Sequence, residues 1–192
     1  MKLNAYALVE LGGEYIVGKS RKTVQIIILL AVIVIGGYAI GTAIFKKDPS
    51  GTLKVGQEPP NFTLADLNGG TTNLSDFKGK PVVINFWGTF CEPCVREMPE
   101  FERQYVKWKD RGLVILAINL SEDTLTVNNF VKRFNLTYPI LRDQNRKTER
   151  SYSLRQYPTT FFVKPDGTLM EVYVGGMLEE DINERVERLL EL

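Results

Sequence analysis

The sequence predicts an α/β domain in which helices flank a central mixed sheet, with a β-hairpin in front of it and one transmembrane helix before both. Short apolar runs typical of buried strands alternate with amphipathic helical patterns, and a hairpin pattern and a last helix close the chain. A long uncharged stretch near the N-terminus predicts the membrane helix. We therefore expect a cytoplasmic tail at 1–23, an anchor at 24–45, a linker at 46–57 and a folded domain at 58–192.

The expected anchor, residues 24–45, contains no Asp, Glu, Lys or Arg. At 1.5 Å per residue, a helix of this length spans the hydrocarbon core of about 30 Å. The apolar region of a cleaved secretory signal is only about 7–15 residues long, so an uncleaved anchor is favoured and cleavage is the alternative. Basic residues flank the stretch with a slight excess before it. This bias predicts a single-pass protein of the cell membrane with its domain on the extracytoplasmic side.

The domain is expected to begin with the front hairpin, because residues 62–64 and 71–74 alternate around a glycine-rich turn. The first strand of the main sheet is predicted at 82–87. An amphipathic helix should follow and run to about Arg111, kinked at Pro99 and ended by Gly112. The remaining elements are a strand at 113–119, a helix at 124–134, a short strand at 138–141, a helix at 144–153, a hairpin of 160–163 with 169–174, and a closing helix at 179–192.

The only two cysteines, Cys91 and Cys94, lie in a C-x-x-C motif between the strand at 82–87 and the helix that follows it. This spacing places Cys91 near the N-terminus of the helix and Cys94 one turn later, facing inward. Unpaired N–H groups and the helix dipole stabilise a thiolate there, so the pKa of Cys91 should fall below its usual value of about 8.5. Cys91 could then attack a disulfide, and Cys94 could resolve the mixed disulfide that forms.

Other interpretations of the cysteine pair are weaker. A structural disulfide across so short a loop constrains the unfolded chain little. Structural zinc needs four ligands, and the chain has no further Cys and no His. The absence of His also excludes Ser-His-Asp and Cys-His catalysis. With a net charge of +1 and no recognisable motif, nucleic-acid binding is not expected, and neither is a metal or an organic cofactor.

Two carboxylates and one peptide bond could support the thiols. Glu97 lies three residues after Cys94 on the same helix face, where it is either solvated or a buried acid of raised pKa that passes protons. Glu92, between the cysteines, opposes the helix field and favours a reductant over an oxidant. The Tyr157–Pro158 bond is either an ordinary trans bond or a cis bond that exposes the Tyr157 backbone to an extended substrate.

Together these motifs resemble the thioredoxin superfamily. The match comprises Phe86-Trp87 before Cys91-Glu92-Pro93-Cys94, a proline five residues later, and Tyr157-Pro158-Thr159-Thr160. The front hairpin resembles the redoxin/TlpA-like branch, and the run Asn85-Phe86-Trp87-Gly88-Thr89 followed by C-E-P-C and Glu97 resembles the membrane-anchored ResA-type thiol–disulfide oxidoreductases. The similarity extends over about residues 55–192.

The resemblance implies a reductase of the haem-binding C-x-x-C-H disulfide of apocytochrome c, re-reduced by a CcdA/DsbD-like membrane thiol donor. Cys91 would attack, Cys94 would resolve, Glu97 would tune the thiols, and Pro158 would be cis. The other expected supports are Asn85, Trp87, Glu92, Pro93 and Tyr157. Phe90 replaces the usual Trp before the first cysteine, and Asn85 replaces a buried acid of ordinary thioredoxins, which shifts proton handling to Glu97.

Of two rival functions, one has a different reaction and the other has a different client. A peroxiredoxin-like peroxidase would need Pro and Thr where Ile84 and Gly88 stand, seven and three residues before Cys91. A dithiol reductase with another client, such as a protein of spore-wall synthesis, would share every residue of the motif.

Overall fold

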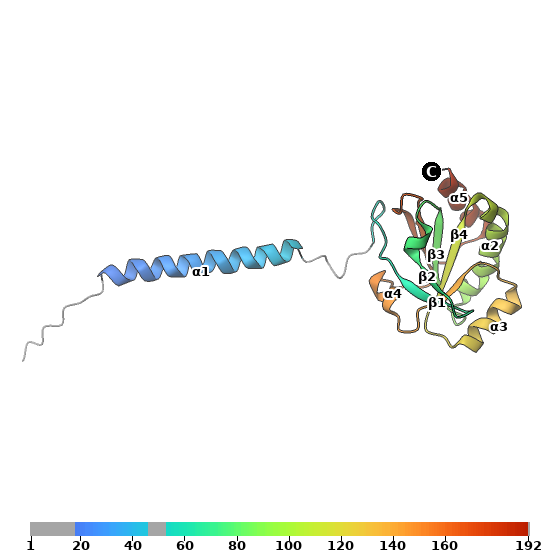
Figure 1. Cartoon of the computed structure of the whole chain (residues 1–192), viewed down its shortest axis with the longest axis horizontal. Helices are drawn as coiled ribbons and strands as arrows, with labels where there is room; N and C mark the ends of the chain where they lie inside the picture. The colour runs from blue at the N-terminus through green and yellow to red at the C-terminus, as the bar shows by residue number, and fades with distance from the viewer. Residues whose placement is uncertain (1–17, 46–52, 192) are drawn as a thin grey trace, which may run out of the picture. The chain divides into compact units, whose positions relative to one another are not determined.

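The computed structural model describes residues 18–45 and 53–191. The chain divides into two compact units, residues 1–49 and 50–192, and each is described by itself. The first unit contains α1 (Gly18–Phe45), a single helix that begins before the expected start at residue 24 (Figure 1). Its described side chains from Val24 to Ile35 are all exposed.

Among the described residues, none of the helices is both long enough and apolar enough to cross a membrane. Side chains of α1 are described for residues 24–38 only. Most of the expected tail and residues 46–52 of the expected linker lie outside the described residues. The anchor at 24–45 and the orientation of the chain therefore stay predictions.

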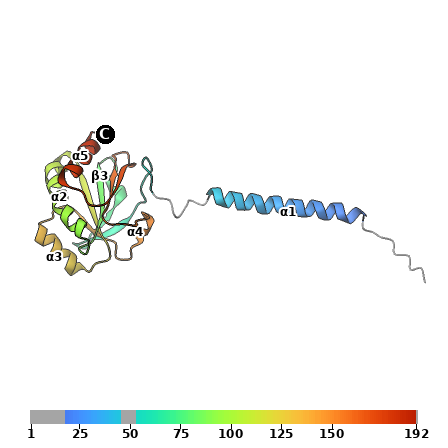
Figure 2. The same ribbon diagram turned by 180° about the vertical axis from the view of Figure 1, so that it is seen from behind.

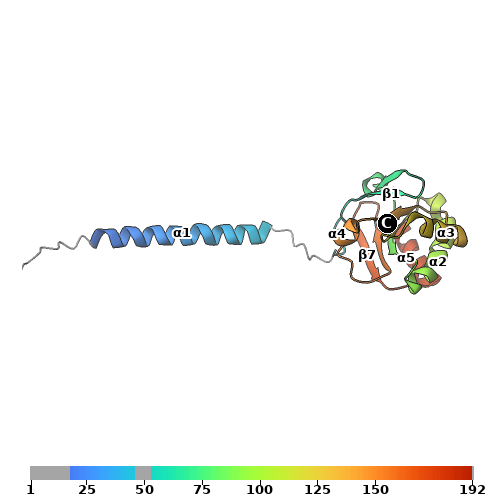
Figure 3. The same ribbon diagram turned by 90° about the horizontal axis from the view of Figure 1, so that it is seen from below.

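The second unit is built on a seven-stranded mixed sheet with the order β2-β1-β5-β4-β3-β6-β7. The central pairs β3–β4 and β4–β5 are parallel, and the outer pairs are antiparallel. Figure 3 shows β1 and β7 at opposite sides of this unit. The strands are β1 (Thr63–Asp66), β2 (Thr71–Asn73), β3 (Val82–Trp87), β4 (Val114–Asn119), β5 (Ile140–Arg142), β6 (Thr159–Val163) and β7 (Leu169–Val174). The mixed sheet and both hairpins expected from the sequence are confirmed.

Helices cover the two faces of the sheet unequally. Buried side chains of α2, α3 and α5 pack on one face, whereas α4 lies toward the other (Figures 1 and 2). The helices are α2 (Glu92–Trp108), α3 (Thr124–Phe134), α4 (Lys147–Ser151) and α5 (Glu179–Leu190), with the 3-10 turns η1 (Leu74–Phe77) and η2 (Lys109–Arg111). The helix α2 continues through Pro99, and Gly112 ends η2 with a φ of 93°, a conformation that glycine adopts without strain.

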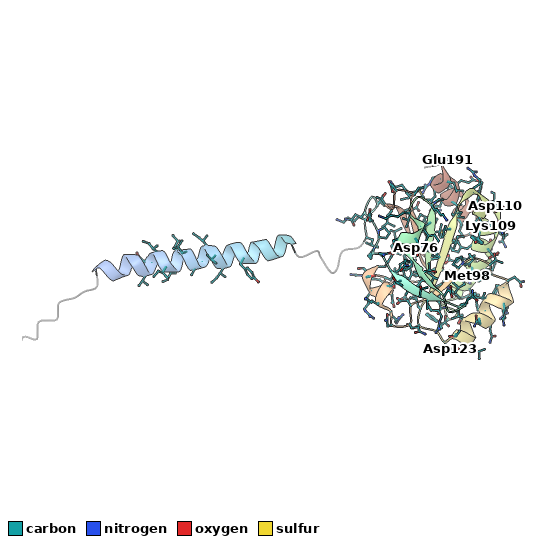
Figure 4. All side chains as sticks on the ribbon, in the orientation of Figure 1. Asp76, Met98, Lys109, Asp110, Asp123 and Glu191 are labelled. Carbon is teal, nitrogen blue, oxygen red and sulfur yellow. A yellow bond between two sulfur atoms is a disulfide. The ribbon has the colours of Figure 1, made fainter. Side chains whose placement is uncertain are left out.

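Alternating side chains of β3 divide the interior into two cores. Val83 and Trp87 face the core beneath α2 and α5, while Ile84 and Phe86 face the opposite core. Met98 of α2 is fully buried in the first core and is labelled in Figure 4. Because both faces of β3 are covered, the strand that leads to the cysteines is held rigidly.

Several boundaries differ from the expected ones, and three of these differences have a clear physical reason. The strand β5 begins at Ile140, after Pro139, whose ring leaves no N–H for a ladder. The helix α4 spans only Lys147–Ser151, and the buried carboxylate of Asp143 accepts hydrogen bonds from the backbone N–H groups at its start. Gly56 and Gln57 exchange backbone hydrogen bonds with Leu169 at the start of β7, so the end of the expected linker packs on the domain.

Candidate active site

The two cysteines lie at the N-terminus of α2, where the expected geometry is confirmed. Cys91 is the N-cap residue, and its Sγ accepts a hydrogen bond from the backbone N–H of Cys94 at 3.3 Å. Pro93 occupies the first turn, where a missing N–H costs nothing. The two cysteines form a disulfide, with their Cα atoms 5.2 Å apart.

The two sulfur-bearing residues differ in access to solvent. Cys94 is 0% exposed and belongs to the core beneath α2, whereas Cys91 is only partly buried. A partner disulfide can therefore approach Cys91 but not Cys94, and this difference follows from the single helical turn that separates them.

Glu97 is buried, which decides between the two interpretations of this residue. Its side chain is 0% exposed, and its Oε1 and Oε2 accept hydrogen bonds from Asn85 Nδ2 at 2.8 Å and from Met177 N at 3.1 Å. Burial raises the pKa of Glu97 to about 7, although the bonds from Asn85 and Met177 favour the charged form and lower it. One turn after Cys94, the site thus contains a carboxyl group that can gain or lose a proton near neutral pH.

Strand β3 supplies the supports beneath the cysteines. Asn85 is fully buried and links Glu97 to Thr160 of β6, whose Oγ1 accepts its second N–H at 3.0 Å. Trp87 is also fully buried, and its ring packs 4.8 Å from the ring of Phe130 on α3. Both supports lie on the face of β3 that α2 covers, as the alternation of the strand requires.

The expected proline loop lies at the same end of the sheet. The Tyr157–Pro158 bond is cis, and the carbonyl of Pro158 accepts a hydrogen bond from Gly175 N at 2.9 Å. The next residue, Gly176, approaches Pro93 so closely that an added Cβ would lie 3.1 Å from the Pro93 Cβ. The segment after β7 thus packs against the first turn of α2.

The phenol of Tyr157 is hydrogen-bonded to residues at the start of α4. Its hydroxyl donates to Glu149 and accepts from Arg146, and burial raises the pKa of Tyr157 to about 12. The phenol therefore stays protonated at neutral pH and orients the loop that contains Pro158.

Two exposed side chains border Cys91. Glu92 is 84% exposed and forms an ion pair with Arg96 one turn along α2. The positive charge of the Arg96 guanidinium partly offsets the negative charge of this carboxylate. The effect of Glu92 on a thiolate at Cys91 is therefore weaker than the sequence suggested. Phe90 is 64% exposed, and its ring lies over Gly88, where an added Cβ would collide with it.

Glu122 is a supporting residue that the sequence analysis missed. It follows β4, and its carboxylate accepts hydrogen bonds from the backbone N–H and the hydroxyl of Thr89, two residues before Cys91. Asn119 Nδ2 donates to the same carboxylate at 2.7 Å. No local pattern marks such a residue, because the loop it holds lies 33 positions earlier in the chain.

Replacing Glu122 by alanine should loosen the loop before Cys91. The change leaves the partly buried N–H of Thr89 without its charged acceptor, so we expect a loss of about 1–3 kcal/mol in the free energy of unfolding. Urea unfolding of the oxidised protein measures the loss. Glu180→Ala, at an exposed position of α5, is the control, and equal stability of both variants would contradict the role of Glu122.

Comparisons with known proteins agree with this geometry. Residues 55–172 match the model of the AhpC/TSA family. The thiol-disulfide oxidoreductase ResA of Bacillus subtilis is 39% identical over 166 residues, which cover 86% of this chain and 92% of the relative. The protein of the same name from Geobacillus kaustophilus is 39% identical over 168 residues, 88% and 94% of the two chains.

A solved structure shows the same fold. The thioredoxin domain of a thiol-disulfide oxidoreductase from Bacteroides vulgatus superposes with a TM-score of 0.65 at 25% identity, covering 72% of this chain and 99% of that one. The chain therefore belongs to the AhpC/TSA family and, within it, to the ResA-type thiol–disulfide oxidoreductases with a thioredoxin-like fold.

Proposed function

We propose that this oxidoreductase is a membrane-anchored reductase that acts outside the cytoplasm on the C-x-x-C-H disulfide of apocytochrome c, so that haem can be attached. The observation that supports it best is the pairing of one accessible sulfur, at Cys91, with a buried acid of pKa about 7 at Glu97. That pair is suited to thiol–disulfide exchange near neutral pH, because the acid can exchange a proton with a thiol as the sulfur bonds change.

The proposed reaction transfers two electrons to the client. The Cys91 thiolate attacks one sulfur of the client disulfide, which forms a mixed disulfide and releases the other client sulfur as a thiolate. Cys94 then loses its proton, with Glu97 as the acceptor, and attacks the Cys91 sulfur. The client leaves with both cysteines reduced, and the enzyme is left with the Cys91–Cys94 disulfide. A membrane thiol donor of the CcdA/DsbD type would return the two electrons.

The charges around the cysteines support a reductant. Glu92 and Glu97 both place carboxyl groups within the first turns of α2, and a negative charge there opposes the stabilisation of a thiolate by the helix N-terminus. A dithiol with a poorly stabilised thiolate is more readily oxidised, so it gives electrons to its partner. The ion pair of Glu92 with Arg96 weakens one of these two charges and leaves the main effect to Glu97.

The location rests on the sequence of residues 24–45. An uncharged stretch of this length favours a membrane anchor, and the basic residues before it favour a cytoplasmic N-terminus. The domain would then lie in a compartment where disulfides persist and where a reductant needs its own electron supply.

Trapping with Cys94→Ala tests the client. Without the resolving thiol, the mixed disulfide on Cys91 persists, so we expect apocytochrome c to accumulate as a covalent adduct in the membrane fraction. Mass spectrometry of the adduct, released by dithiothreitol, identifies the client. The double variant Cys91→Ala/Cys94→Ala is the matched control and should trap nothing.

A different result of the trapping experiment would support the rival function, a reductase with another client. Adducts with other proteins, together with normal haem attachment in a deletion strain, would mean that the reductase serves another client, such as a protein of spore-wall synthesis. An adduct recovered outside the membrane fraction would contradict the proposed anchor.

A further inference from the structure

Three fully buried polar side chains from three elements meet behind the disulfide: Asn85 of β3, Glu97 of α2 and Thr160 of β6. Asn85 and Thr160 are register partners on neighbouring antiparallel strands, so the sheet itself fixes their separation. The Asn85 side chain points to the face that α2 covers, because one of its N–H groups reaches Glu97. The amide therefore joins the helix of the cysteines to the strand that follows Pro158.

The hydrogen-bonding capacity of the amide is only half used. Nδ2 donates one N–H to Glu97 Oε1 at 2.8 Å and the other to Thr160 Oγ1 at 3.0 Å. Asn85 Oδ1 is buried and has no hydrogen-bond partner among the described residues. This arrangement suits an ionised Glu97, whose two oxygens receive N–H groups from Asn85 and Met177.

A protonated Glu97 requires a hydrogen-bond acceptor as well as donors, and the amide of Asn85 can supply that acceptor. The carboxylic acid carries an O–H that seeks an acceptor, and rotation of the Asn85 amide would present Oδ1 to it. In that orientation the Thr160 hydroxyl can donate to Oδ1, since a hydroxyl is both a donor and an acceptor. A leucine at position 85 would serve neither charge state, and an aspartate would add a second charge beside Glu97.

We propose that Asn85 is a positioning residue of the thiol–disulfide reaction: its amide holds Glu97 in place in both charge states, with Thr160 as the second anchor. The mechanistic meaning rests on the proposed function, in which Glu97 accepts the proton of Cys94. Through Thr160, the amide also connects the charge of Glu97 to the strand beside the client-facing proline loop. Asn85 acts through Glu97 and touches no reacting sulfur in this scheme.

The other ionisable groups near Glu97 do not replace this role. Cys91 and Cys94 lie on its own helix and are joined to each other. Tyr138, from the segment before β5, donates to the carbonyl of Met98, and burial, followed by the charges of Glu102 and Glu97, raises its pKa well above 10. Tyr138 therefore stays neutral across the range in which Glu97 titrates.

The test is a titration of Glu97 in the oxidised full-length protein, solubilised in neutral detergent. The probe is the ¹³C resonance of its side-chain carboxyl group, assigned by its absence in Glu97→Gln. In Asn85→Ala the ionised carboxylate loses a charge-assisted hydrogen bond, whereas the protonated acid loses a weaker bond between neutral groups. We therefore expect the titration midpoint to rise by about one pH unit, a tenfold change in proton affinity. Gln104→Ala, at another buried amide side chain, this one on α2, should leave the midpoint unchanged.

Two more variants separate positioning from a merely structural role. Asn85→Asp keeps the shape of the side chain and should give two coupled titrations, because two adjoining carboxyl groups do not readily ionise together. Thr160→Val leaves the N–H to Glu97 in place and should move the midpoint less than Asn85→Ala does.

An unchanged Glu97 midpoint in folded Asn85→Ala overturns the proposal, and so does a single unshifted titration in Asn85→Asp if the alanine variant fails to fold. No client is present in this titration. Failure to trap apocytochrome c would therefore reject the proposed client while leaving the role of Asn85 standing.

Discussion

Replacing Cys91 by alanine is expected to leave less than about one thousandth of the disulfide-reducing activity, a loss of the size seen when a catalytic nucleophile is removed. Cys91 is the only thiol of the reduced domain that a client disulfide can reach, because Cys94 is 0% exposed and the chain has no third cysteine. Reduction of insulin disulfides by the purified protein, with dithiothreitol as electron donor, measures the loss against the uncatalysed rate.

Cys94→Ala provides the contrast. This variant keeps the exposed nucleophile, so it should react once with a model disulfide such as 5,5′-dithiobis(2-nitrobenzoate) and then remain as the mixed disulfide. Cys91→Ala should show no fast first reaction. Equal first-turnover rates in the two variants would show that the buried sulfur is also reached, and would contradict the assignment of Cys91 as the attacking thiol.

Elements defined by contiguous residues could be predicted from the sequence. The strand at 82–87 and the helix at 124–134 coincide with β3 and α3. They could be predicted because a continuous apolar run indicates a buried strand, and apolar residues at helical spacing indicate a helix with one buried face. The placement of Cys91 at the start of α2 followed from the same junction. The helix expected at 144–153 was too long, since the structure restricts α4 to five residues.

The surroundings of Glu97 could not be predicted in the same way. Helical spacing places Glu97 on the same face of α2 as Cys94. Whether that face is exposed to solvent or buried depends on which other parts of the chain pack over it. The partners that close the site, Asn85 and the Met177 backbone, are 12 and 80 positions away. Glu122 was missed for a similar reason, because its acceptor role exists only once β4 lies beside β3. A local sequence pattern shows that a surface is buried, but it does not show which groups from distant parts of the chain cover that surface.

Replacing Glu97 by glutamine is expected to stabilise the oxidised protein above neutral pH. A carboxyl group whose pKa is higher in the folded than in the unfolded state binds its proton more tightly when folded. Its favourable contribution is therefore present at low pH and is lost as the pH rises from about 4.5, its ordinary value, to about 7. The loss amounts to roughly 3 kcal/mol, since each pH unit between the two pKa values contributes about 1.4 kcal/mol. Glutamine has no charge to bury, so its variant should escape this loss.

The substitution is tolerated only because of the groups around it. Glutamine can accept the Met177 N–H with its oxygen and donate its own N–H to Asn85 Oδ1 once that amide rotates, which leaves both ends of the side chain bonded. Urea unfolding at pH 5 and pH 8 measures the effect. The free energy of unfolding of the native protein should be lower at pH 8 than at pH 5. That of Glu97→Gln should be nearly the same at both pH values, and Glu180→Gln should show the same decrease as the native protein. Parallel pH dependence of the native protein and Glu97→Gln would mean that Glu97 does not titrate in this range, and the proton acceptor proposed for Cys94 would have to be sought elsewhere.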